Sequence, residues 1–126
     1  MESTFKRINI EFIEQSKQRY DTLGDYWETP ETIEFRISIL PKYGYSFYVL
    51  LHELWEKYRN DKLGITDKSV DEFDMSHSEL DDPGLSLEAP YHKTHMEADV
   101  LERMAVLLDG EDWVEYENII LGKDEQ

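Results

Sequence analysis

The chain has 126 residues and carries 29 Asp and Glu against 13 Lys and Arg, so its formal net charge of −16 is large for its size. Binding to nucleic acid or to an anionic membrane needs clustered Lys and Arg, so this charge argues against either as a direct partner. The chain has no cysteine, which excludes a disulfide framework, a thiolate zinc finger and a thiol nucleophile.

The length and the apolar pattern indicate one small cytoplasmic domain. A chain of this length fits a modest core, so residues 1–126 are expected to form a single domain. The first ten residues lack the apolar segment of a signal peptide, and no apolar run reaches the length that spans a bilayer. We therefore expect no membrane partner, and the sequence leaves the oligomeric state open.

Alternation of apolar and polar residues predicts two strands, one over residues 6–13 and one over residues 32–39. In the second strand every other residue from Ile33 to Ile39 is apolar. A turn followed by a short aromatic stretch over residues 23–27 indicates a third strand between them. Together these segments predict a small antiparallel sheet with one apolar face.

The rest of the chain is predicted to be mainly helical. The clearest helix covers residues 45–61, where apolar residues recur every three or four positions. A short helix over residues 66–75, a second long helix from Pro90 to about residue 108, and a last helix over residues 111–121 follow. A sheet followed along the chain by helices indicates an α+β fold. In this fold a small N-terminal antiparallel sheet packs on two long helices, and short C-terminal helices complete the domain.

A His-Glu-Leu-Trp-Glu run occupies residues 52–56, inside the first long helix. One helical turn separates His52 from Glu56, so both side chains can reach one point in space. An imidazole and a carboxylate at that spacing are two ligands for a divalent ion such as zinc. Glu53 is then an unligated carboxylate next to the ion, where it could accept a proton from a bound water.

The second long helix repeats this pattern, because His95, Asp99 and Glu102 share the side opposite its apolar residues. Two such faces are what a metal site buried between helices requires, since a buried charged cluster without an ion would be costly. His95 would complete a set of three protein ligands with His52 and Glu56 and leave a fourth position for water. The alternative is that each face is the solvated side of an amphipathic helix.

Other residues near these two faces are weaker candidates. His92 lies three residues before His95 and could replace or supplement it. Asp99 lies one turn after His95 and could be a fourth ligand or could hold an imidazole in the right tautomer. The remaining candidates are more readily explained as ordinary polar residues on a short helix or in a loop: Asp71, Asp74 and His77.

Several segments resemble, in the same order, a family of small, largely uncharacterised proteins encoded by bacteriophages and prophages. The resemblance covers roughly residues 20–120, and its most specific parts are the run over residues 52–56 and the Ala-Pro-Tyr-His-Lys-Thr-His segment over residues 89–95. It implies a phage or prophage origin, a bacterial or phage-infected cytoplasm, and a minimal zincin-like arrangement.

Within that resemblance, His52 and Glu56 match metal-ligand positions and Glu53 matches the general base. The zincin motif is His-Glu-x-x-His, so Glu56 stands where the motif has an imidazole. A carboxylate there still binds zinc, but it lowers the positive charge felt by the bound water, so weaker peptidase activity is expected than with the full motif.

These observations predict a metallopeptidase-like hydrolase of phage or prophage origin. Zn²⁺ or another divalent metal would be held by His52, Glu56 and His95, with Glu53 as general base and a peptide or amide as substrate. The alternative is an acidic phage protein that binds and inhibits a host protein, as a mimic of nucleic-acid charge, with a metal that is structural or absent. A third interpretation is an assembly factor with a purely structural metal.

Overall fold

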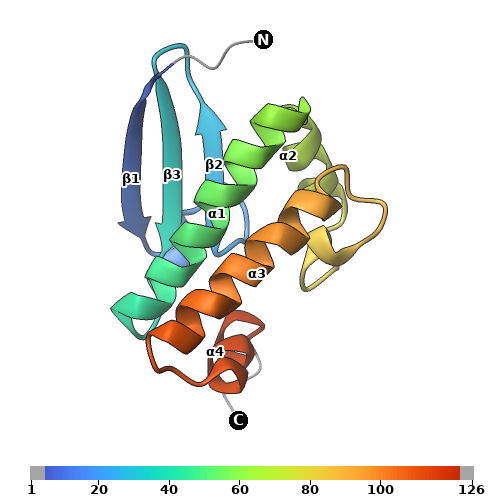
Figure 1. The fold of residues 1–126 in the computed structure, drawn as a ribbon. Coiled ribbons are helices and arrows are strands. Elements are labelled where there is room, and N and C mark those ends of the chain that lie inside the picture. Colours follow the sequence, from blue (N-terminus) through green and yellow to red (C-terminus); the bar gives the residue numbers. More distant parts are fainter. Residues whose placement is uncertain (1–4, 123–126) are drawn as a thin grey trace.

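A computed structural model describes residues 5–122 of the chain (Figure 1). The α+β fold is confirmed, because a sheet forms the N-terminal part and helices form the rest. Single-turn 3₁₀ helices η1 (Gln15–Lys17) and η2 (Pro83–Leu85) lie in two connections. The main elements are the strands β1 (Arg7–Ile13), β2 (Gly24–Glu28) and β3 (Thr32–Ser38) and the helices α1 (Tyr43–Leu63), α2 (Asp67–Ser76), α3 (His92–Leu108) and α4 (Trp113–Ile120).

The sheet is mixed, with the strand order β1-β3-β2. β2 and β3 pair antiparallel through a short connection, as expected. β1 pairs parallel to β3, with Ile8 opposite Ile33 and Phe12 opposite Ile37, so the prediction of an antiparallel sheet is wrong for this pair. The chain reverses once between β1 and β2 and again between β2 and β3. β3 therefore runs in the direction of β1 and can pair with it only in parallel.

The layers follow the order sheet, α1, α3 (Figure 1). α1 packs on β2 and β3, whereas the principal contact of α3 is with α1, so one of the two long helices covers the sheet rather than both. The core contains Phe35 and Ile37 of β3, Leu50 of α1, Val106 of α3 and Tyr116 of α4. No helix within residues 5–122 combines the length and the apolar character needed to cross a lipid bilayer.

Local signals set the ends of α1 and α2. Gly64 ends α1 with φ of 77°, a left-handed conformation that glycine adopts without a steric penalty. Thr66 caps α2, since its side chain accepts a hydrogen bond from the backbone N–H of Ser69 at 3.1 Å. These two neighbouring signals turn the chain sharply, so α2 folds back toward the sheet.

A buried lysine links α1 to its neighbours. The ammonium group of Lys57 donates hydrogen bonds to Glu28 at 2.7 Å, to Asp61 at 2.8 Å and to Asp67 at 3.1 Å, while its side chain is 4% exposed. A buried ammonium group requires such partners, because an unpaired charge in the interior is strongly destabilising. The contacts tie α1 to β2 and to the first turn of α2.

The two long helices turn their apolar sides largely outward. On α1, Phe47 is 40% exposed and Tyr58 is 52% exposed, and on α3, Met104 is 53% exposed. The buried positions of α3 include Thr94 and Glu102. An amphipathic helix in a small domain normally buries its apolar side, so this reversed arrangement means that the polar sides of α1 and α3 face each other inside the protein.

Replacement of Ile37 by alanine tests the observed core. Ile37 is 0% exposed, so Ile37→Ala should lower the free energy of unfolding by about 2–5 kcal/mol through lost burial and a residual cavity. Ile39 lies just beyond the end of β3 and is 57% exposed. Ile39→Ala should therefore change stability by less than about 1 kcal/mol. Urea unfolding followed by circular dichroism measures both, and equal losses would contradict this packing.

Candidate metal centre

The buried sides of α1 and α3 meet at two imidazoles and a carboxylate. His52 Nε2 lies 3.1 Å from His95 Nδ1, and Glu56 Oε2 lies 3.2 Å from the first atom and 3.0 Å from the second. The three atoms form a nearly equilateral triangle. Tetrahedral zinc with bonds of about 2.0–2.1 Å separates its ligand atoms by about 3.3 Å, so the triangle is close to the size that zinc uses.

Each imidazole also contacts a carboxylate with its outer nitrogen. His52 Nδ1 lies 2.7 Å from Glu102 Oε1, and His95 Nε2 lies 3.1 Å from Asp82 Oδ1. A ring N–H that donates to these oxygens leaves His52 Nε2 and His95 Nδ1 free to accept a metal. Carboxylates in this position are typical of metal-binding histidines, because they fix the tautomer and the direction of the ring.

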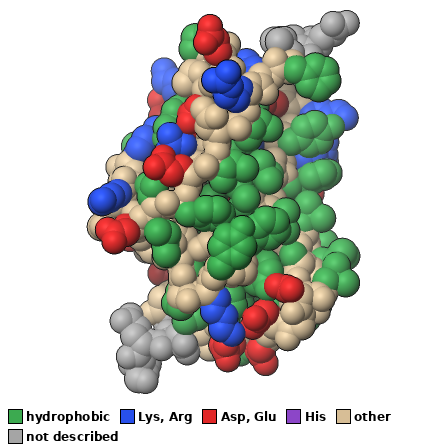
Figure 2. Space-filling view, turned by 90° about the vertical axis from the view of Figure 1, so that its left-hand side faces the viewer, with side chains coloured by type: hydrophobic (Ala, Val, Ile, Leu, Met, Phe, Trp, Pro, Cys, Tyr) green, Lys and Arg blue, Asp and Glu red, His purple; other side chains and the backbone are tan. Residues whose placement is uncertain are grey.

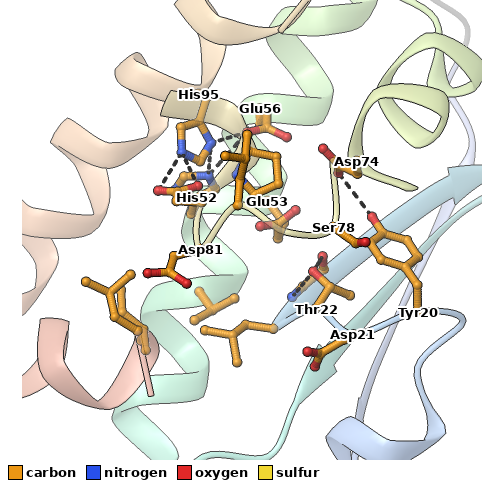
Figure 3. A pocket seen from close by; sticks show the side chains of 18 of the residues that line it. Tyr20, Asp21, Thr22, His52, Glu53, Glu56, Asp74, Ser78, Asp81 and His95 are labelled. Atoms are coloured by element: carbon orange, nitrogen blue, oxygen red, sulfur yellow. Dashed lines mark hydrogen bonds and ion pairs between the residues drawn. The ribbon is translucent and has the colours of Figure 1, made fainter. Parts of the chain in front are cut away.

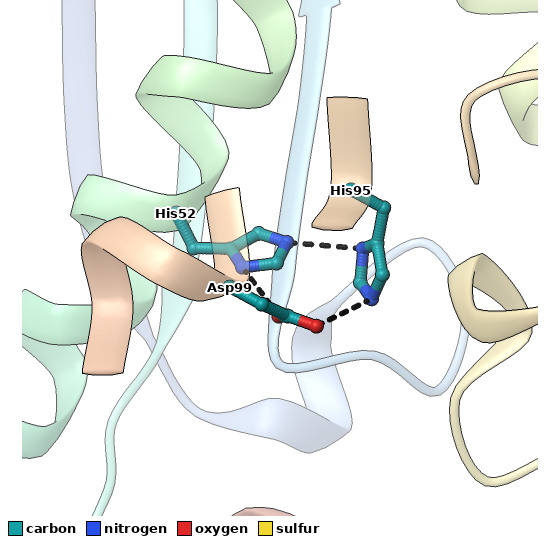
Figure 4. A group of neighbouring side chains, drawn as sticks. All are labelled: His52, His95 and Asp99. Atoms are coloured by element: carbon teal, nitrogen blue, oxygen red, sulfur yellow. Dashed lines mark hydrogen bonds and ion pairs between the residues drawn. The ribbon is translucent and has the colours of Figure 1, made fainter. Parts of the chain in front are cut away.

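Asp99 offers a second way to complete a ligand set. It lies beside both rings, with Oδ1 3.3 Å from His52 Nδ1 and Oδ2 3.7 Å from His95 Nε2 (Figure 4). One donor atom from each of His52, His95 and Asp99 lies within 4.8 Å of the others. We favour Glu56 as the third ligand, because its oxygen makes the tighter triangle. Asp99 then supports the outer ring nitrogens.

Tyrosines from outside α1 and α3 hold the two buried carboxylates. The hydroxyl of Tyr26, on β2, donates to Glu56 Oε1 at 2.8 Å and accepts from the side-chain amide of Asn60 at 2.9 Å. The hydroxyl of Tyr116, on α4, donates to Glu102 Oε2 at 2.5 Å. The carboxylates therefore have partners for both of their oxygens, which limits their freedom to rotate.

Hydrogen bonding across the cluster shifts the pKa values of its members. Burial lowers the pKa of His95, but hydrogen bonds with Asp82 and Glu56 outweigh it and raise that pKa to about 10. Burial likewise lowers the pKa of His52, but hydrogen bonds with Asp99 and Glu102 outweigh it, so the pKa is raised. Burial opposes the charge of Glu56, yet the two imidazoles lower its pKa to about 2. The cluster therefore strongly favours positive charge at its centre.

A divalent ion can supply that positive charge. Two protonated imidazoles carry the same total charge as two neutral imidazoles with one divalent cation between them. An ion can therefore replace the protons without changing the electrostatic balance of the surrounding carboxylates. The donor set, two ring nitrogens and one carboxylate oxygen, is of the type that zinc accepts.

Glu53 lies beside the cluster and lines a cavity of about 570 Å³ that opens next to it (Figure 3). Its side chain is partly accessible. Burial raises the pKa of the Glu53 carboxyl, and the nearby charge of Glu56 raises it further. The side chains lining the cavity include eight Asp and Glu and, among the described residues, neither Lys nor Arg. Glu53, a carboxyl group of raised pKa, therefore lies at the cavity wall close to the candidate metal ligands.

The structure brings His52, Glu56, His95 and Asp99 together, and neither polar face is solvated, since His52 is 5% exposed and His95 is 8% exposed. His92 lies outside the cluster, where its ring Nδ1 is 2.9 Å from the carbonyl oxygen of Gly84. The weaker candidates have other contacts: Asp71 pairs with Arg19, Asp74 accepts hydrogen bonds from Tyr20 and Tyr91, and His77 stacks on Phe73.

Sequence reasoning missed most of the supporting residues. Helical spacing placed Glu102 on the polar side of α3 with His95 and Asp99, but its contact with His52 was not predicted. Asp82 lies in the connection before η2 and Tyr26 lies on β2, and no spacing in the sequence relates either to the cluster. Their roles depend on contacts between segments that are distant in the chain.

Two glycines make room for side chains of the site. A Cβ on Gly84 would lie 2.4 Å from Cγ of His95, and a Cβ on Gly24 would lie 2.6 Å from Cγ of Glu53. Both distances are shorter than carbon atoms tolerate. Gly84 therefore allows the connection around η2 to pass directly over the His95 ring, and Gly24 allows β2 to pass close to Glu53.

Comparisons of the chain with protein-family models, with curated proteins and with solved structures find no match. The phage family and the zincin-like arrangement therefore stay predictions from the sequence.

Substitution of Gly84 tests the close approach to His95. Gly84→Ala should force the ring to move, at a cost of about 1–3 kcal/mol in the free energy of unfolding, as overpacking usually does. Gly44→Ala is the control, because its nearest contact is the Tyr48 hydroxyl at 3.3 Å, and a change within about 1 kcal/mol is expected. Urea unfolding with chelator measures stability, and NMR of the histidine rings reports the position of His95. Unchanged His95 resonances in Gly84→Ala would contradict the assignment.

Proposed function

We propose that the protein is a zinc-dependent hydrolase that cleaves a peptide or amide bond. The observation that carries the proposal is the buried triangle of His52 Nε2, His95 Nδ1 and Glu56 Oε2, with sides of 3.0–3.2 Å. Glu53 adds a carboxylate beside that triangle, at the wall of a cavity large enough for part of a peptide.

The residues present fit a zinc ion. His52, Glu56 and His95 would hold it, while Glu102 and Asp82 keep the two rings in the tautomers that direct a lone pair to the centre of the triangle. When bound, zinc supplies Lewis acidity, which polarises a carbonyl group and makes water a better nucleophile. With three protein ligands, the bound ion would remain accessible to water or substrate from the cavity.

Glu53 is the group that moves the proton. In hydrolysis, the oxygen of water bonds to the carbonyl carbon, and the carbon–nitrogen bond breaks. Glu53 accepts the proton that water loses and delivers it to the leaving nitrogen, so the products are an acid and an amine. Burial raises the pKa of its carboxyl, and a carboxylate whose pKa is raised is a better proton acceptor than an exposed one.

The cavity lining selects against anionic substrates. Asp21, Asp74 and Asp81 line the cavity together with the carboxylates of the cluster. A substrate with negative charge near the scissile bond would be repelled, whereas a neutral or basic peptide would be tolerated or attracted. The preferred substrate is accordingly a peptide or amide without acidic groups close to the bond that is cut.

Zinc content should distinguish His95, the proposed ligand, from His92, which lies outside the cluster. The wild-type protein, purified without chelator, should contain about one zinc ion per chain. His95→Ala should bind zinc at least about 100-fold more weakly, because a ligand is lost, whereas His92→Ala should keep its zinc. Elemental analysis and competition with a chromophoric chelator measure both effects.

The zinc affinity should also fall as pH falls, because the ion competes with protons for the imidazoles. Substoichiometric zinc in the wild type, or equal affinity in the two variants, would contradict this site.

Replacement of Glu53 separates metal binding from catalysis. Glu53→Gln keeps the size of the side chain but removes its basicity, so zinc content should stay unchanged while turnover falls by about 10²–10⁴-fold. The assay is cleavage of a pool of fluorescence-quenched neutral and basic peptides. Glu88→Gln, at an exposed position, is the control and should retain wild-type turnover. Full activity in Glu53→Gln would rule out its role as the base.

A further inference from the structure

The outward sides of α1 and α3 form an apolar groove. The groove has a volume of about 480 Å³, and none of the described residues that line it is charged. It lies on the opposite side of the two helices from the imidazole–carboxylate cluster. We call this surface the apolar face, and its central residues are Leu51, Leu54 and Tyr58 of α1 and Leu101, Met104 and Leu108 of α3.

The apolar face continues from α1 onto β1. The ring of Tyr43 lies 6.3 Å from that of Phe47 and 5.8 Å from that of Phe12, which links the start of α1 to the strand. Ile8 and Ile10 share the inner side of β1 with Phe12, but they remain 51% and 44% exposed. Figure 2 shows hydrophobic side chains gathered over this side of the molecule, with most charged side chains at the margins.

The area of this surface is that of a stable interface. Tyr58 and Met104 are about half exposed, and Leu108 is 82% exposed. Large side chains of this kind offer roughly 150–250 Å² each when fully exposed, so eight of them at about half exposure present on the order of 600–1,000 Å². These eight are Ile8, Ile10, Tyr43, Phe47, Tyr58, Leu101, Met104 and Leu108. A standard protein interface buries about 800 Å² on each partner, whereas monomers rarely expose more than a few hundred Å² of continuous apolar surface.

The lack of charge on this surface fits a second copy as the occupant. Each chain carries a net charge of −16, which opposes self-association, so two copies can approach closely only across a surface that lacks carboxylates. The groove is such a surface. A partner attracted by charge would be basic, and it would dock where the carboxylates are, for example at the mouth of the acidic cavity. Closed twofold dimers are also the commonest protein assemblies, and their interfaces use one patch on both copies.

We infer that the chain forms a twofold dimer in which the apolar face of one copy covers that of the other. The α1–α3 pairs of the two copies then pack together as four helices, and the outward apolar sides become buried. The two acidic cavities stay open to solvent, because they lie on the far side of each helix pair. The dimer is independent of the proposed hydrolase activity.

Sedimentation equilibrium of the full chain tests the dimer. The wild type should sediment as a dimer, and Met104→Glu should raise the dissociation constant by about 100-fold or more, because the twofold axis places the new charge in the interface twice. Leu87→Glu is the matched control, since Leu87 is 86% exposed and lies outside the apolar face, and it should dimerise like the wild type. Tyr58→Glu tests the same face from α1.

Folding of each variant is checked by circular dichroism and by urea unfolding, and the spectrum should match that of the wild type because the substituted residues are exposed. Salt gives a second readout, since screening of the like charges should tighten the dimer. A wild type that stays monomeric up to about 1 mM would overturn the proposal and leave a different protein as the occupant. The proposal would also be overturned if the Met104→Glu and Tyr58→Glu variants fold and dimerise as well as the wild type.

Discussion

The burial of two charged helix sides against each other is the constraint on which the structure depends. Carboxylates and imidazoles removed from water are strongly destabilising unless each finds a partner of suitable charge and geometry. His52, Glu56 and His95 satisfy this condition through one another. Glu102 and Asp82 then satisfy the outer ring nitrogens. Truncation of any one of these groups would leave others unpaired, so the cluster acts as a unit rather than as a sum of separate contacts.

The same constraint explains the exposed apolar face. α1 and α3 use their polar sides for each other, and only part of their apolar residues, such as Leu50 and Val106, reach the core. Most of their remaining apolar side chains therefore face outward. The core is correspondingly built from tyrosines and from side chains of the sheet, such as Tyr45, Tyr116 and Phe35. The candidate metal centre and the candidate dimer interface are therefore opposite consequences of one packing arrangement.

Much of this arrangement could be predicted from the sequence, because it depends on local periodicity. The bounds of the helices follow from apolar spacing and from signals such as Gly64 and Thr66. The spacing of His52 and Glu56 placed both on one face, and the side of α3 that carries His95 was identified in the same way. Periodicity does not reveal which side of a helix is buried, since a second helix can cover a polar side as well as an apolar one.

Features that depend on distant segments could not be predicted. Alternating residues in β1 fit a parallel or an antiparallel partner equally well, so the direction of its pairing is set by the path of the chain. The close approach of Gly84 to His95 depends on η2 folding back over α3, which no local pattern predicts. The tyrosine partners of Glu56 and Glu102 likewise come from elements that only the tertiary fold brings near.

If the cluster binds a divalent ion as proposed, the cavity beside Glu53 also affects how quickly that ion arrives. A concave surface lined by eight carboxylates concentrates the field of a strongly acidic protein at its mouth. This field attracts divalent cations from solution toward the mouth of the cavity. Each carboxylate on the cavity wall can then bind a cation weakly and transiently before it reaches the cluster. Ion capture should therefore be rapid at low ionic strength, and dissolved salt should slow the arrival of the ion much more than its departure from the buried ligands.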